Sequence, residues 1–170
     1  MINHKVTYKK MIRKKPLTKE AALLRMADLC ARGEHCSSEI REKLRKLMIS
    51  VSDANAIIDY LEENRYIDNL RFAKSFARDK VRFSGWGRNK IRMALAVKRI
   101  SSSDIREALE EINEEDYEEA VSRAARAKAR NLDLSDYEDR AKLYRYLASR
   151  GFESAVISNA IRDLRAENDD

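Results

Sequence analysis

The sequence predicts an all-α protein built as an elongated tandem array of three three-helix, helix-turn-helix-like modules. Four glycines and one proline in 170 residues are too few for the many turns of a β-sandwich. The hydrophobic fraction of 44% is enough for a core, while 38% charged residues indicate much exposed surface, as in a thin-layered helical protein. A third observation is an apolar pattern that repeats along the chain.

Short interruptions divide the helical pattern into nine expected helices. They cover residues 18–32, 37–47, 52–64, 68–83, 87–98, 102–112, 114–130, 136–149 and 153–166. Helix starts are predicted from residues whose side-chain oxygen can accept from a free N–H group, namely Thr18, Ser37, Ser52, Ser102 or Ser103, and Ser135. Gly33 and Gly151 stand where helices are expected to end.

The nine helices fall into three sets of three, because offsets of 51 and then 52 residues superimpose the apolar positions without a gap. The matched triplets are Ile40, Ile91 and Leu143; Leu44, Leu95 and Leu147; Ile49, Ile100 and Phe152; Ala54, Ile105 and Ile157; Ile58, Leu109 and Ile161; and Leu61, Ile112 and Leu164. Such agreement indicates three copies of one small bundle joined end to end.

Charge is distributed unevenly over the expected domains. Residues 1–17, expected to form a flexible basic tail, carry +6, which equals the net charge of the whole chain. The modules expected at 18–67, 68–112 and 113–170 carry −1, +5 and −4. The positive field therefore arises from the tail and from the middle module.

The middle module holds the main predicted interaction surface. Residues 71–99 contain ten basic groups and a single acid, Asp79. We expect the partner or DNA surface to comprise Arg71, Lys74, Arg78, Lys80, Arg82, Trp86, Arg88, Lys90, Arg92 and Arg99. Because local acids do not balance this charge, a surface for a polyanion or an acidic partner is favoured over a merely solvated face.

Helical spacing divides these groups into stripes. Arg71, Lys74, Arg78 and Arg82 share one stripe of the first helix of the module, and Arg88, Arg92 and Arg99 share one on the next. An apolar stripe of Phe72, Phe76 and Phe83 is predicted to pack into the core beside the first. In the tail, Lys9, Lys10, Arg13, Lys14 and Lys15 are candidates for phosphate contacts, and a solubilising role explains them equally well.

The residues that enzymes need are not arranged for catalysis. The glycines of residues 84–87 lack the spacing of a phosphate-binding loop, and the two histidines, His4 and His35, stand far apart. Cys30 and Cys36 fit no zinc motif, and we expect Cys30 in the core and Cys36 near a helix start, both reduced inside a cell. We predict no enzyme activity, cofactor or metal, no membrane segment, and a monomeric cytoplasmic protein.

Three-helix modules invite comparison with helix-turn-helix DNA readers, whose last helix enters the major groove. Here the corresponding helices are acidic: residues 52–64 carry −4 and residues 104–112 carry −3. Phosphates would repel helices of that sign, so sequence-specific readout through them is disfavoured.

Three segments carry a resemblance to a known family. They are residues 32–44 (RGEHCSSEIREKL), 61–73 (LEENRYIDNLRFA) and 82–91 (RFSGWGRNKI). They resemble motifs of the RecX family of recombinase regulators, and the resemblance extends over about residues 18–166. Cys36 stands where the family usually has a serine cap, and Asn69 where it often has aspartate.

The resemblance implies three tandem three-helix repeats and a role in DNA repair, recombination and the SOS response. It also implies binding to the RecA recombinase and to the RecA–DNA filament, with single- or double-stranded DNA met as part of that filament, and mostly inhibition of ATPase and strand exchange. The alternatives are a non-specific architectural DNA-binding protein without a recombinase partner and a scaffold that binds only proteins.

Overall fold

The computed structural model describes residues 17–169, and it describes side chains as far as residue 167. Within this range the chain forms nine α-helices and no strand. The helices are α1 (Lys19–Ala31), α2 (Ser37–Lys46), α3 (Val51–Glu63), α4 (Asn69–Ser84), α5 (Arg88–Val97), α6 (Ser102–Glu110), α7 (Glu114–Ala129), α8 (Tyr137–Ser149) and α9 (Ser154–Asp169). The predicted all-α fold is confirmed.

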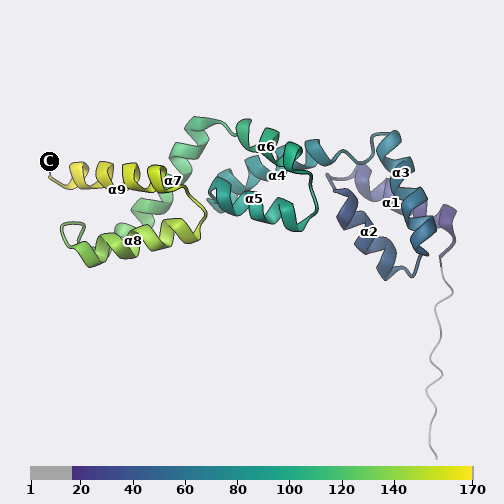
Figure 1. Ribbon diagram of the computed structural model, residues 1–170, viewed down its shortest axis with the longest axis horizontal. Coiled ribbons are helices and arrows are strands. Elements are labelled where there is room, and N and C mark those ends of the chain that lie inside the picture. The colour runs from purple at the N-terminus through teal and green to yellow at the C-terminus, as the bar shows by residue number, and fades with distance from the viewer. Residues whose placement is uncertain (1–16, 170) are drawn as a thin grey trace, which may run out of the picture.

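The helices pack in three consecutive groups, called here module 1 (α1–α3), module 2 (α4–α6) and module 3 (α7–α9). Figure 1 shows the modules following one another along the long axis of the molecule. Between modules 2 and 3, α4 also packs against α7. The elongated arrangement follows from small bundles that contact only their neighbours in the chain.

Most helices begin at a residue whose side chain accepts from the first turn. Thr18 caps α1 as predicted, accepting from the N–H of Ala21. The caps of α3, α6 and α8 are Ser50, Ser101 and Asp136, which lie one or two residues away from the serines predicted. In α2 the cap position is Cys36, whose side chain makes no capping hydrogen bond, so the prediction of Ser37 is also corrected.

The repeated apolar frame forms the interior. All three members of the Ile40 and Leu44 triplets are fully buried. Only Ile49 and Ile161 among the matched positions are partly exposed. One expectation was wrong: Phe83, assigned to the core beside Phe72, is 84% exposed. It belongs to the last turn of α4, two residues before Gly85, where the helix ends.

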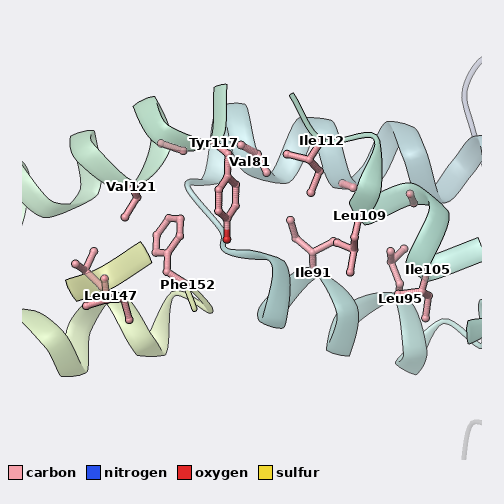
Figure 2. Close-up of a cluster of buried hydrophobic side chains, with 14 of the residues drawn as sticks. Val81, Ile91, Leu95, Ile105, Leu109, Ile112, Tyr117, Val121, Leu147 and Phe152 are labelled. Carbon is pink, nitrogen blue, oxygen red and sulfur yellow. The ribbon is translucent and has the colours of Figure 1, made fainter. Parts of the chain in front are cut away.

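The buried side chains form two clusters. One lies within module 1, around Met26, Ile40, Leu44 and Ile57. The other runs without interruption through modules 2 and 3, and Figure 2 shows Val81 and Ile91 of module 2 near Tyr117 of module 3. Cys36, although it begins α2 of module 1, is buried in the second cluster. Modules 2 and 3 therefore share one hydrophobic core.

Candidate interaction surface

The predicted surface is positioned by α4, α5 and the turn between them. Asp68 starts α4 by accepting from the N–H of Arg71. Gly85 ends α4 in the left-handed conformation, with φ at 57°, which favours glycine because a side chain there is strained. Gly87 begins α5. The turn brings Trp86 between the end of α4 and the start of α5.

The stripe on α4 forms as predicted, but its charges are paired. Arg71 Nε lies 2.6 Å from Glu34 Oε1 of module 1. Lys74 Nζ lies 2.7 Å from Glu107 of α6 and 2.5 Å from Glu111 at the end of that helix, and the hydrogen bonds that Lys74 donates to these carboxylates raise its pKa. Further along, Arg78 lies 3.5 Å from Asp79 and Arg82 lies 2.8 Å from Asp116 of α7.

On α5 the pairing continues. The side chain of Arg88 is only 19% exposed and lies 2.6 Å from Glu114 and 3.6 Å from Glu153. Its guanidinium also covers the ring of Tyr117 at 4.0 Å from the centroid. Arg92 donates weakly to Asn89 at 3.5 Å, and Arg99 lies beyond the end of α5 with φ at 60°. The expected stripe of three arginines is thus broken at its last member.

Carboxylates from outside residues 71–99 therefore balance charge that the acids within this segment do not. They pair with four residues: Arg71, Lys74, Arg82 and Arg88. The partners come mostly from other helices, 26 to 37 positions away in the sequence. A net charge summed over a continuous segment cannot detect them. Exposed pairs of this kind contribute little to stability, but they offset much of the positive field.

Two lysines of the predicted surface have aromatic neighbours in place of carboxylate partners. Lys80 Nζ and Lys90 Nζ each lie 4.8 Å from the centroid of the Trp86 ring, and Lys80 lies 5.3 Å from that of Phe76. Phe76 meets Trp86 edge to face at 6.4 Å. We call Phe76, Lys80, Trp86 and Lys90 the Trp86 cluster. Among the described residues, neither lysine forms an ion pair.

The Trp86 cluster presents two ammonium groups held by aromatic rings. A cation over an aromatic face is attracted by the ring quadrupole while its hydrogen-bond donors stay available. Aromatic support of this kind limits the conformations of two long side chains before any ligand arrives. The geometry suits an anion with more than one negative centre, such as successive phosphates.

A polar network lies on the module 1 side of this surface and was not anticipated. Glu39 Oε1 lies 2.5 Å from Lys98 Nζ, and Glu39 Oε2 lies 3.0 Å from His35 Nδ1. Burial alone would raise the pKa of Glu39, but the hydrogen bonds with Lys98 and His35 outweigh it and lower that pKa. Nothing in the local sequence predicted the pairing of Glu39 with Lys98.

The remaining expectations concern other parts of the chain. The candidate tail contacts Lys9, Lys10, Arg13, Lys14 and Lys15 lie outside the described residues. In the part of the chain that is described, no three His, Cys, Asp or Glu side chains gather in a way that could hold a metal ion. No described helix is both long and apolar enough to cross a membrane.

Comparison with known proteins decides the family. Residues 68–109 match the model of the second three-helix domain of RecX, and residues 114–161 match that of the third. A protein of Vibrio parahaemolyticus named Regulatory protein RecX is 34% identical over 85% of this chain and 89% of the relative. The chain belongs to the RecX family of regulatory proteins.

Other RecX proteins support the same assignment. Regulatory protein RecX of Ralstonia nicotianae is 30% identical over 82% of this chain and 86% of its own length. A crystal structure of regulatory protein RecX superimposes with a TM-score of 0.75 at 26% identity, covering 85% of this chain and 71% of that one. RecX from Lactobacillus salivarius has the same fold, with a TM-score of 0.76 at 21% identity, covering 87% and 97%.

The two matched RecX domains coincide with the part of the molecule that has a continuous core. They contain α4–α6 and most of α7–α9, and the Trp86 cluster lies in the first of them. The candidate surface of this RecX-family chain thus lies within residues that match a RecX domain.

Proposed function

We propose that this RecX-family protein binds the RecA recombinase on DNA and modulates, mostly by inhibition, the ATPase and strand-exchange activity of the filament. The observation that carries the proposal is the family relationship over 85% of the chain, because RecX proteins are regulatory by name. Monomeric action in the cytoplasm, where recombinase filaments form, is part of the same proposal.

The physical properties of the chain support this assignment. An elongated array of modules suits a long, regular filament better than a small ligand. The Trp86 cluster offers cations to DNA phosphates or to acidic residues of the recombinase. We propose that Lys80 and Lys90, with Arg92 and Arg99 on the same module, form the functional part of the basic surface, and that the paired residues contribute less.

The direct test is the ATPase of the cognate recombinase on single-stranded DNA, with and without this protein. We expect ATP hydrolysis to fall in a saturable manner as the protein is added. An unchanged ATPase at saturating concentration would contradict the proposal. Salt-dependent DNA binding that is indifferent to recombinase would instead favour an architectural DNA-binding protein.

Two double variants test the assignment within the surface. Lys80→Ala with Lys90→Ala removes two cations without carboxylate partners, whereas Lys74→Ala with Arg82→Ala removes two that are ion-paired. The total charge lost is the same. We expect the first pair to weaken inhibition strongly and the second to weaken it much less. Equal effects would show that only net charge matters.

A further inference from the structure

The hairpin of α8 and α9 carries a groove at the surface of module 3, far along the chain from the Trp86 cluster. It has a volume of about 430 Å³ and is lined by Tyr137, Arg140, Ala141, Tyr144, Arg145, Ser158 and Ile161. The lining contains two arginines and no carboxylate. This is unexpected in a module whose net charge is −4.

Helical spacing explains why these residues line one groove. Tyr137, Ala141 and Tyr144 lie at i, i+4 and i+7 and therefore share a face of α8. On α9, Ser158 and Ile161 lie at i and i+3 and face the same opening. The small side chain of Ala141 leaves room between the two tyrosine rings, while Ile161 packs against the core below. Tyr137 is 72% exposed, so its ring is accessible from solvent.

The arginines differ in how they are held. Arg140 Nη1 donates to the carbonyl oxygens of Leu134 at 3.0 Å and Ser135 at 2.6 Å, and its guanidinium lies 5.9 Å from the centroid of the Tyr137 ring. These contacts fix Arg140 beside the ring. Arg145 is exposed and forms no ion pair with any described residue, so its donors are free for a ligand.

None of the acidic residues of module 3 belongs to the lining of the groove. Glu114, Glu118 and Glu119 belong to α7, which is not among the elements that line the groove. At the start of α8, the Asp136 side chain caps the helix and Asp139 pairs with Lys142, while Glu138 is exposed and follows Tyr137 in the sequence. The lining itself therefore carries two positive charges and no negative charge, although the module as a whole is acidic.

We propose that this groove binds single-stranded nucleic acid, with a base stacked on Tyr137 or Tyr144 and the adjoining phosphate contacted by Arg145. Accessible aromatic rings next to unpaired arginines are the combination that unpaired strands require, because every base has a face that can stack and every linkage carries a charge. The bases of a duplex are already stacked on one another, so a duplex offers this groove phosphates but no free base face on which a tyrosine ring could stack.

The test is the affinity of the full chain for a fluorescent oligo-dT strand at low salt, measured by anisotropy without recombinase. Its outcome is thus independent of the proposed regulation of RecA. We expect Tyr137→Ala to weaken binding about fivefold or more, the usual effect of removing one stacked aromatic residue. Tyr137→Phe, which keeps the ring, is expected to bind like the unmodified protein.

Arg145→Ala is expected to weaken oligo-dT binding and to reduce the slope of log affinity against log salt by about one. Arg126→Ala is the matched control, since Arg126 lies on α7 of the same module and is paired with Glu167. It removes the same charge away from the groove. Neither Tyr137→Ala nor Arg145→Ala is expected to change duplex affinity as much as oligo-dT affinity.

Several results would overturn the proposal. These are the absence of oligo-dT binding by the unmodified protein, equal losses in Arg145→Ala and Arg126→Ala, or unchanged affinity in Tyr137→Ala. An abasic strand that binds as tightly as oligo-dT would exclude stacking. If the groove variants impair binding of a glutamate-rich peptide and leave oligo-dT affinity unchanged, the groove is a protein-binding site instead.

Discussion

The junction between modules 1 and 2 and the junction between modules 2 and 3 are made from different kinds of contact. At the first, side chains meet: Asn69 Oδ1 accepts from the backbone N–H of Ser37 at 3.0 Å, and Arg71 and Lys98 pair with Glu34 and Glu39. Of the buried core residues of module 1, Cys36 alone joins the core of module 2.

At the second junction the backbones themselves meet. The N–H of Gly87 donates to the carbonyl oxygen of Arg150 at 2.9 Å, and that of Asn89 to Gly151 at 3.0 Å. The Arg150 side chain donates in return to the carbonyl oxygens of Ser84 and Gly85. Tyr117 of module 3 also accepts from the backbone N–H of Arg88 of module 2 at 2.9 Å, and its ring lies next to Phe152 (Figure 2).

The difference shows that junctions between copies of one module can differ in how much free energy is needed to open them. Opening the second junction would expose a shared core and break backbone hydrogen bonds. Opening the first would mainly exchange side-chain contacts for water, at much lower cost. We therefore expect module 1 to open or unfold locally before modules 2 and 3 separate, which would let the protein adjust along an extended partner.

The largest effect is expected from Gly87→Ala. A Cβ at this position would lie 2.2 Å from the backbone carbon and oxygen of Gly151 and 2.3 Å from the nitrogen of Phe152. Backbone atoms cannot move aside as a flexible side chain can, so modules 2 and 3 would be forced apart. We expect the free energy of unfolding to fall by about 3 kcal/mol or more in urea denaturation.

Gly33→Ala is the control for that variant, because a Cβ on Gly33 would meet nothing within 4 Å. Its stability is expected to change by no more than about 0.5 kcal/mol. If Gly87→Ala unfolded at the same urea concentration as the unmodified protein, the close backbone contact between modules 2 and 3 would not hold.

Tyr117→Phe tests the side-chain hydrogen bonds at the junction between modules 2 and 3. The Tyr117 hydroxyl donates to Glu153 at 2.5 Å and accepts from the N–H of Arg88 at 2.9 Å, and burial raises the pKa of this tyrosine. Loss of the hydroxyl leaves the Arg88 backbone N–H without its acceptor and takes one donor from Glu153, so we expect a loss of about 1–3 kcal/mol in thermal or urea unfolding. Tyr60→Phe, at a 46% exposed site, should change little.

Asn69→Ala tests the first junction at a smaller scale. Asn69 accepts from the backbone N–H of Ser37 and donates to the Ser37 hydroxyl at 2.8 Å. We expect a loss of about 1 kcal/mol. Hydrogen exchange should accelerate in α2 while α4 and α7 keep their protection. Uniform acceleration throughout all three modules would contradict the idea that module 1 opens separately.

The smallest effect concerns pH. Because the pKa of Glu39 is lowered in the folded protein, its contribution to stability is fully present above the ordinary value of 4.5 and is lost as the pH falls through the lowered value. Acidification should therefore increase hydrogen exchange in module 1. Glu39→Gln should remove this dependence, and Glu20→Gln should not. An unaltered pH profile in Glu39→Gln would show that the pair with Lys98 does not secure the junction.

The sequence by itself determined the helices, their order and the repeated core. Positions such as Ile40, Ile91 and Leu143 could be matched because burial on one face of a helix leaves a local period of three to four residues. The family motifs could also be recognised from the sequence, because each is a short, continuous segment. Trp86 likewise falls between the helices predicted at 68–83 and 87–98, and it lies between α4 and α5 in the structure.

Tertiary structure decided which charges are free and which surfaces are hollow. Glu107, Glu111 and Asp116 neutralise Lys74 and Arg82 only because α6 and α7 pack beside α4. The arginine- and tyrosine-lined groove exists only because α8 lies against α9. Helix formation depends on neighbours within about one turn, whereas ion pairing and surface shape depend on residues brought together from distant parts of the chain.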